Sequence, residues 1–337
     1  MRILVLGGTA WLGGLIAAGA LERGHEVTCV ARGEAGEVPA GTRFVGADRE
    51  QDDALAAVSR ERWDAVVDVA RQPGQVRRAV RDLEPVAGRF VFVSSCSAYA
   101  SQAELGADED AALLPALVAD RMASPEDYGS AKAACEAAVL GAFGRERSFI
   151  VRPGLLGGPG DPSGRTDYWP WRFAHPAEQG RILVPDAPDL PTAVLDVRDL
   201  VAWMLRAIED GLSGVCNAQG RPEAFPAHLA AARVAAGSDA LPIPAPEAWL
   251  QEHGVAEWAG PRSLPLWLVD RDWYGMNARS IDRALAGGLE LRPLVDTLRD
   301  ALAHRESLEP SALRDRAGLA DADESGLLAA LEERARD

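Results

Sequence analysis

The chain has 337 residues, of which 47% are hydrophobic and 26% are charged, a balance typical of a globular protein rather than a disordered one. Its formal net charge of −16 argues against nucleic acid and anionic membranes as partners, because such a surface repels phosphate groups. The cysteines Cys29, Cys96, Cys135 and Cys216 form no C-x-x-C pair, and no histidines stand at ligand spacing. We therefore expect a cytoplasmic protein with no membrane span, no disulfide framework and no metal site.

The first half of the chain alternates short apolar runs with helical patterns. Strands are predicted at residues 3–6, 27–30, 43–45, 65–69, 89–93 and 148–151, and helices at 12–23, 52–60, 75–83 and 125 to about 143. This alternation requires a parallel sheet with helices on both faces. The predicted fold class is α/β, a Rossmann-type doubly wound parallel sheet with a smaller, mixed C-terminal substrate domain.

Beyond residue 155 the alternation weakens, and Pro, Gly and Trp become dense. Helices are predicted at 197–209, 227–236, 292–304 and 324–334, with a short strand at 215–217. We expect residues 1–155, joined by about 193–210, to form the dinucleotide-binding domain. Residues 156–192 and 211–337 are expected to form the substrate-binding region with a helical C-terminus.

A glycine-rich turn follows the first predicted strand and opens the first helix. In this context the turn favours a pyrophosphate bound at the helix N-terminus. Ala10 stands where the G-x-x-G-x-x-G form has a glycine, and a glycine-rich turn without a ligand is the alternative. The cofactor-binding residues predicted here are Gly7, Thr9, Ala10, Trp11, Leu12 and Gly13.

The residues at the end of the second predicted strand indicate whether the cofactor is NAD or NADP. NAD-binding Rossmann sites usually carry a carboxylate there for the ribose hydroxyls, whereas this chain has Ala31-Arg32. A guanidinium can bind a 2′-phosphate, so we favour NADP over NAD. An ordinary surface arginine is the alternative in so Arg-rich a chain.

Lys132 is the only lysine among the 35 Lys and Arg residues, and it follows one of only four tyrosines, Tyr128, by four positions. That spacing puts both side chains on one helix face, one turn apart. Because a phenol titrates near pH ~10, it needs a neighbouring cation to act as an acid and base at neutral pH. The pair therefore predicts catalysis, although two surface residues can meet at this spacing by chance.

Together these segments resemble the extended branch of the short-chain dehydrogenases/reductases, often called the NAD-dependent epimerase/dehydratase family. The resemblance extends to about residue 220 and is carried by Gly7, Gly8, Thr9, Gly13, Asp48, Val69-Ala70, Ser94-Ser95, Tyr128, Lys132, Arg152-Pro153-Gly154 and the stretch 195–200. These motifs are specific for the superfamily and unspecific for the substrate.

The resemblance implies roles for individual residues. Tyr128 would transfer the proton, Lys132 would bind the nicotinamide ribose and lower the Tyr128 pKa, and Ser95 would hydrogen-bond the substrate oxygen. Ser94 and Ser97 compete for that last role. Asp48 is expected near the adenine, Ala70 near the ribose and Pro153 at the cofactor. Sugar dehydratases of this branch have Asp-Glu where this chain has Cys96-Ser97, which argues against dehydration.

A loop at residues 165–172 concentrates aromatic and basic side chains. It could cover the substrate, stacking on a ring and pairing an anionic group, or it could be an apolar anchor between domains. The substrate-contacting residues predicted on the first interpretation are Arg165, Tyr168, Trp169, Trp171 and Arg172.

The sequence therefore predicts an NAD(P)-dependent oxidoreductase acting on a small-molecule substrate, with monomer and homodimer both open. A nucleotide-sugar 4-epimerase that keeps NAD bound is the first alternative. A relative that senses dinucleotide or associates with RNA without turnover is the alternative from another class, and the −16 charge counts against it.

Overall fold

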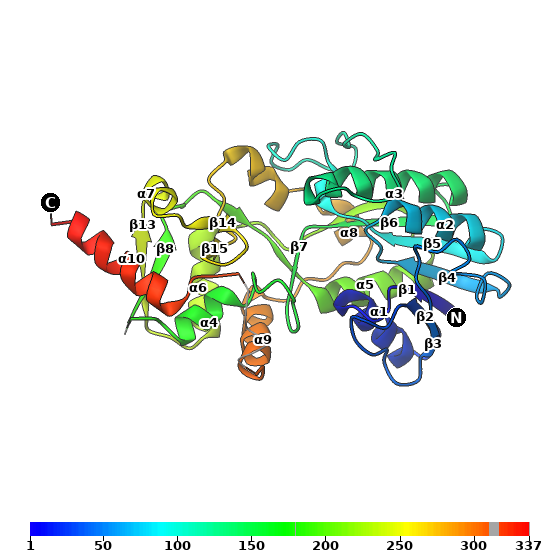
Figure 1. Cartoon of the computed structure of the whole chain (residues 1–337), viewed down its shortest axis with the longest axis horizontal. Helices are drawn as coiled ribbons and strands as arrows, with labels where there is room; N and C mark the ends of the chain where they lie inside the picture. Colours follow the sequence, from blue (N-terminus) through cyan, green and yellow to red (C-terminus); the bar gives the residue numbers. More distant parts are fainter. Residues whose placement is uncertain (179, 310–316, 337) are drawn as a thin grey trace. The chain divides into compact units, whose positions relative to one another are not determined.

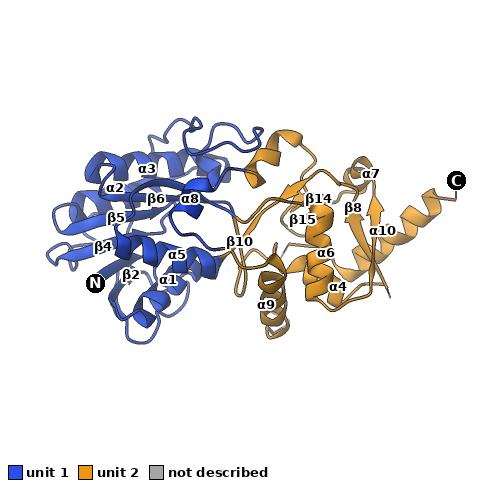
Figure 2. Ribbon diagram, turned by 180° about the vertical axis from the view of Figure 1, so that it is seen from behind, with its two compact units in different colours: residues 1–154, 197–219, 279–290 blue, residues 155–196, 220–278, 291–337 orange. Residues whose placement is uncertain are grey.

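The computed structural model describes residues 1–178, 180–309 and 317–336. The chain divides into two compact units, which Figure 2 colours separately. Unit 1 comprises residues 1–154, 197–219 and 279–290, and unit 2 comprises residues 155–196, 220–278 and 291–337. Among the described residues, every helix is too short or too polar to cross a lipid bilayer.

Unit 1 is built on a seven-stranded parallel sheet in the order β11-β6-β5-β4-β1-β2-β3. The strands are β1 (Arg2–Leu6), β2 (Glu26–Ala31), β3 (Arg43–Gly46), β4 (Trp63–Asp68), β5 (Ala87–Val93), β6 (Ser148–Pro153) and β11 (Gly214–Ala218). The winding direction reverses between β1 and β4, and ligands of such sheets bind beside this reversal, at the carboxyl ends of the strands. The predicted doubly wound parallel sheet is confirmed.

Helices cover both faces of this sheet, with α1 and α5 on one face and α2 and α3 on the other (Figure 1). Their bounds are α1 (Trp11–Glu22), α2 (Pro73–Leu83), α3 (Tyr128–Phe143) and α5 (Val197–Asp210), with the short η1 (Cys96–Ala98), η2 (Pro125–Asp127) and α8 (Asp282–Ala286) between them. Because both faces are covered, the central strands are largely apolar, and Ile3 to Leu6 of β1 are fully buried.

Unit 2 has short elements and no large sheet among its described residues. Its strands pair two by two: β7 (Leu155–Gly157) with β10 (Val194–Asp196), β8 (Arg181–Pro185) with β13 (Leu241–Ala245), β9 (Pro191–Thr192) with β12 (Glu223–Ala224), and β14 (Ala256–Trp258) with β15 (Ser263–Pro265). The helices are α4 (Tyr168–Ala174), α6 (Phe225–Ala235), α7 (Glu247–Glu252), η3 (Arg271–Asn277), α9 (Leu294–Glu306) and α10 (Asp321–Arg334). Large side chains, including Trp169 and Trp267, fill the core between them.

The structure corrects two expectations about the fold. Residues 52–60 form turns rather than a helix. The Val58 amide donates to Leu55 O at 2.9 Å, three residues back, and the Trp63 indole donates to Val58 O at 3.0 Å. Residues 211–219 and 279–290 belong to unit 1 rather than to the substrate region, because β11 extends the sheet beside β6 and α8 packs on β11. The expected helical C-terminus includes residues 310–316, which lie outside the described residues.

Candidate active site

The turn after β1 is shaped by glycines that have no room for a side chain. Gly7 has φ +102°, and a Cβ there would lie 2.7 Å from Val69 Cγ2. A Cβ on Gly13 would collide with the carbonyl oxygen of Gly7, so α1 can approach the turn only with glycine here. Ala10 is the N-cap of α1 with φ −87°, a conformation that any residue adopts without strain. The alanine at the family's glycine position therefore costs no backbone strain.

The N-terminus of α1 suits an anionic group. Its first turn contains no acidic residue, so nothing there opposes the positive end of the helix dipole. Trp11 and Leu12 occupy this turn and are half-buried.

Beside this turn, unit 1 contains a cavity of about 340 Å³ at the carboxyl ends of β1, β2, β3 and β4. Six of the residues predicted to bind the cofactor line it: Gly7, Thr9, Ala10, Arg32, Asp48 and Ala70. Trp11, Leu12, Gly13, Lys132 and Pro153 are not among its lining residues. The sequence prediction thus identified residues from four separate segments that meet in one cavity.

Charged side chains that the sequence analysis missed also line this cavity. Glu34 Oε2 lies 3.2 Å from Arg32 Nη2, and both side chains are exposed. Arg49 is buried and donates to both carboxylate oxygens of Asp68, at 2.8 and 2.7 Å. The Arg49 guanidinium is therefore occupied by Asp68 of β4, whereas the exposed Arg32 can leave Glu34 and bind a ligand instead.

Tyr128 begins α3, and Lys132 lies one turn further along the same helix. The Lys132 ammonium is 5.8 Å from the centroid of the Tyr128 ring. It donates to Ala70 O at 2.8 Å and to Val93 O at 2.7 Å, although the side chain is only 2% exposed. These two carbonyls follow β4 and end β5, so the ammonium is held at the carboxyl edge of the sheet.

A glycine brings α3 close to the loop after β5. A Cβ on Gly129 would collide with the carbonyl oxygen of Ser97, so the residue after Tyr128 must be small. The Ser95 hydroxyl accepts from the Ser97 amide at 3.1 Å and is 3.1 Å from Ser97 Oγ. The Ser94 hydroxyl instead donates to the buried carboxylate of Glu136. Because the Ser94 hydroxyl is bonded to Glu136, Ser95 and Ser97 are the candidates that remain for hydrogen-bonding the substrate oxygen.

A buried polar network lies behind these residues, and the sequence analysis did not find it. Arg152 donates to Glu136 at 2.9 Å (Nε to Oε1) and 2.7 Å (Nη2 to Oε2), and to the Tyr99 hydroxyl at 2.9 Å. Tyr99 in turn donates to Asn217 Oδ1 at 2.6 Å. Burial raises the pKa of Tyr99, which makes it a poor proton carrier at neutral pH.

Arg279 is a second residue that no motif indicated. Its guanidinium stacks 3.7 Å from the Tyr99 ring and is 2% exposed. Nη2 donates at 2.7 Å to Ser101 O and to Gln102 Oε1, and Gln102 donates at 3.1 Å to Cys96 O. Nε and Nη1 have no acceptor among the described residues. A buried arginine with orphaned donors, coupled to the loop that carries Ser95, suits contact with a substrate oxygen.

The structure corrects the expectation of a substrate-covering loop at 165–172. Tyr168, Trp169 and Arg172 are at most 1% exposed and lie in the core of unit 2. The Trp169 indole donates to Pro265 O at 2.8 Å, and Arg172 Nε lies 2.9 Å from the buried Glu324.

The other two members of that loop are half-buried and also contact unit 2. The Arg305 guanidinium lies 4.1 Å from the Trp171 ring, and that of Arg165 lies 5.0 Å from the Trp258 ring. These contacts all lie within unit 2, so the segment packs inside that unit and its aromatic faces are already covered there.

Comparison with known proteins agrees with this geometry. The model of the NAD dependent epimerase/dehydratase family matches residues 3–218. The curated dTDP-6-deoxy-L-talose 4-dehydrogenase (NAD(P)(+)) of Kitasatospora kifunensis is 31% identical over 173 residues, 48% of this chain and 54% of the relative. The chain thus aligns with only about half the length of that relative.

Solved structures show the same fold. The Thermus thermophilus UDP-glucose 4-epimerase in complex with NAD has a TM-score of 0.61 at 20% identity, covering 92% of this chain and 100% of that one. The UDP-N-acetylglucosamine 4-epimerase of Bacillus cereus has a TM-score of 0.65 at 16% identity, covering 92% and 98%. Because the family match spans more than half of the chain, this protein belongs to the NAD-dependent epimerase/dehydratase family, the extended short-chain dehydrogenases/reductases.

Proposed function

We propose that this enzyme is an NADP-preferring oxidoreductase that moves hydride between the nicotinamide and a carbonyl or carbinol carbon of a small molecule. The observation that carries the proposal is the position of Lys132. The chain's one lysine is buried at the carboxyl edge of the sheet, hydrogen-bonded to Ala70 O and Val93 O, one helical turn from Tyr128. A cation held there is suited to stabilise a phenolate and to meet a ribose hydroxyl.

The residues around the glycine turn fit a dinucleotide. Gly7 and Gly13 leave no space for side chains, the first turn of α1 has no carboxylate, and the cavity beside them is about 340 Å³. The bound cofactor would supply the carbon that gives or accepts the hydride.

In the reductive direction Tyr128 donates its hydroxyl proton to the substrate oxygen while the carbonyl carbon accepts the hydride. A bound reduced cofactor would supply the hydride that turns the carbonyl into an alcohol, and the Tyr128 phenolate then recovers a proton from solvent. Lys132 stabilises that phenolate, and the Ser95 hydroxyl hydrogen-bonds the substrate oxygen so that the carbonyl carbon becomes more electrophilic.

The preference for NADP rests on a comparison of two interactions of Arg32. Its exposed ion pair with Glu34 is worth about 0.2–1 kcal/mol, as such surface pairs are. Hydrogen bonds to a charged phosphate contribute about 1.5–3 kcal/mol. Arg32 can therefore leave Glu34 at little cost to bind a 2′-phosphate, which supports the preference for NADP over NAD.

A nucleotide-sugar 4-epimerase with retained NAD is the second candidate, supported by the fold shared with two 4-epimerases over 92% of the chain. A dinucleotide-sensing relative without turnover has less support, because Tyr128, Lys132 and Ser95 all lie around the carboxyl edge of one sheet.

The test begins with the nucleotide released when purified protein is denatured. The proposal expects a nearly nucleotide-free protein that then takes up one NADPH per chain. It further expects NADPH oxidation with members of a carbonyl panel that includes dTDP-linked 4-keto sugars, the chemistry named for the curated relative. Stoichiometric NAD released from every preparation would establish the epimerase instead. NADPH binding without oxidation by any carbonyl would favour the sensing relative.

A further inference from the structure

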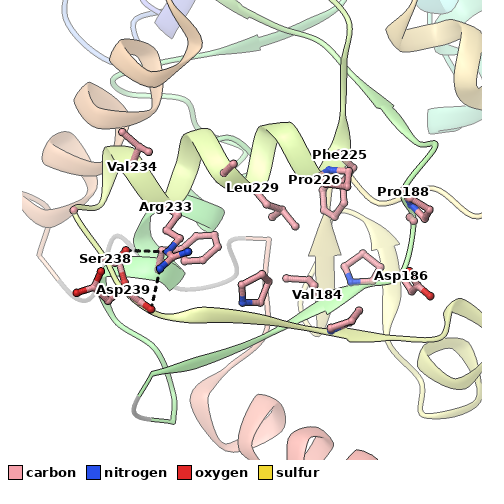
Figure 3. Close-up of a pocket in the computed structure, with 17 residues that line it drawn as sticks. Val184, Asp186, Pro188, Phe225, Pro226, Leu229, Arg233, Val234, Ser238 and Asp239 are labelled. Atoms are coloured by element: carbon pink, nitrogen blue, oxygen red, sulfur yellow. Dashed lines mark hydrogen bonds between the residues drawn. The ribbon is translucent and has the colours of Figure 1, made fainter.

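Unit 2 contains a second cavity, of about 650 Å³, which the hydride-transfer proposal does not use. It lies between α6 and the paired strands β8 and β13, as Figure 3 shows. Every residue that lines it belongs to unit 2. Its volume is within the range of about 300–1,000 Å³ that is usual for small-molecule sites.

The walls of this cavity are mainly apolar. α6 contributes Phe225, Leu229 and Val234, and Phe173 and Val184 come from α4 and β8. Val234 is 64% exposed and lies at the rim of this cavity. An apolar ligand would remove this surface from water.

The backbone around the cavity offers few hydrogen-bond donors, because five lining residues are prolines: Pro185, Pro188, Pro226, Pro242 and Pro244. β13 holds two of them and is already paired with β8 in parallel register. A peptide could not add to β13 as a further strand, since the amide donors of that strand are missing at residues 242 and 244. The occupant expected is therefore a small organic molecule rather than a peptide that adds as a strand.

The charged groups at the cavity exclude a polyanion. Among the described residues that line the cavity, Arg233 is the only basic one, and Asp186 and Asp239 line the same cavity. The Arg233 guanidinium is held at one edge, with Nε donating to Ser238 O at 3.1 Å and Nη2 to Asp239 O at 3.2 Å. One guanidinium opposed by two carboxylates cannot neutralise a diphosphate, but its remaining N–H groups can serve one neutral acceptor.

We propose that this cavity is a binding site for an uncharged, largely apolar organic molecule with one hydrogen-bond acceptor, which Arg233 recognises. The apolar walls bind its rings or chain, and the guanidinium fixes the orientation of its carbonyl or hydroxyl oxygen. The inference is independent of the hydride-transfer proposal, because it uses residues of unit 2 alone.

The test uses N-phenyl-1-naphthylamine, an uncharged fluorophore whose emission rises in apolar surroundings. The proposal expects saturable binding of one molecule per chain. Ala230→Trp should weaken this binding at least tenfold, because exposed Ala230 lines the cavity on α6 and a tryptophan there fills it. Ala227→Trp is the matched control: Ala227 is exposed on the same helix but does not line the cavity. Tm is recorded for both variants, so that unfolding is not mistaken for lost binding.

Two further measurements test the ligand class. 2-Acetylnaphthalene, which has a carbonyl acceptor, should displace the fluorophore at least fivefold better than naphthalene, and Arg233→Met should abolish that difference. UDP should not displace the fluorophore. The proposal is overturned if wild-type protein shows no saturable binding, if the two tryptophan variants bind alike, if Arg233→Met leaves the preference intact, or if UDP competes.

Discussion

The two units contain the same kind of interaction, a buried arginine–glutamate pair, in two different settings. In unit 1 the Arg152–Glu136 pair lies behind the residues proposed for catalysis, and Glu136 also accepts from Ser94, the neighbour of Ser95. In unit 2 the Arg172–Glu324 pair joins α4 to α10. Removing one partner of such a buried pair is strongly destabilising, because it leaves an uncompensated charge in the interior. We therefore expect the pair in unit 1 to affect both stability and turnover, and the pair in unit 2 to affect stability alone.

The largest expected effect concerns chemistry in unit 1. Tyr128→Phe keeps the ring and removes the proton, so turnover should fall by on the order of 10²–10⁴ with NADPH affinity nearly unchanged. Lys132→Arg keeps the charge but changes its reach, so it should impair turnover as well. Turnover is followed by NADPH absorbance, and wild-type rates in Tyr128→Phe would exclude the proposed mechanism.

The buried pair of unit 2 gives the next largest effect. Glu324→Leu removes the buried carboxylate beside Arg172 and leaves its guanidinium only the exposed carboxylate of Asp321, at 2.7 Å. This change should cost about 3–5 kcal/mol, whereas Arg172→Leu/Glu324→Leu should recover most of that loss. Urea unfolding followed by tryptophan fluorescence measures both, and NADPH affinity of the folded variants should equal that of the wild type. Equal destabilisation by the single and the double variant would mean that packing, and not the uncompensated charge, dominates.

The corresponding change in unit 1 sharpens the contrast. Glu136→Leu removes the acceptor of both Arg152 and Ser94. We expect about the same loss of stability as for Glu324→Leu, accompanied here by lower turnover because the Ser95 loop loses a neighbouring contact. If folded Glu136→Leu kept normal kinetics, the pair in unit 1 would be as purely architectural as the pair in unit 2.

A pH effect should arise in unit 2 from His228. Burial lowers the pKa of this histidine to about 4, and neither ring nitrogen has a partner among the described residues. Since the unfolded chain binds this proton near pH ~6.5, stability is full above that pH and falls by about 1.4 kcal/mol for each unit toward pH 4. His228→Leu should flatten the dependence of Tm on pH between 7 and 4.5. His304→Leu is the control, and an unchanged slope in His228→Leu would exclude the buried imidazole as the cause.

The smallest expected effect concerns the cofactor in unit 1. Arg32→Ala should weaken NADPH binding by roughly 1–3 kcal/mol and leave NADH binding nearly unchanged. Glu34→Gln releases Arg32 from its partner and removes a negative charge, so it should tighten NADPH binding slightly. Titration of both cofactors against both variants decides the assignment. An equal loss of NADH and NADPH affinity in Arg32→Ala would refute it.

The two units also differ in how far their structure followed from the sequence. The strands and helices of unit 1 were predicted almost completely, because apolar runs, the glycine turn and the Tyr128–Lys132 spacing are local signals. Arg279 and Gly129 were missed, since their importance depends on contact with loops far away in the sequence. In unit 2 the same aromatic residues, Tyr168 and Trp169, suit a lid or a core equally well in sequence. Only the long-range contacts with Pro265 and Leu319 decide between the two.

The central claim is that unit 1 catalyses net hydride transfer. It is tested most directly with NADPH deuterated at the transferred C4 position and the best carbonyl of the panel. The account predicts one deuterium in each alcohol formed, one NADP⁺ per alcohol, and loss of this label transfer in Tyr128→Phe while NADPH still binds. Products that form without deuterium while the bound nucleotide stays oxidised would contradict the claim.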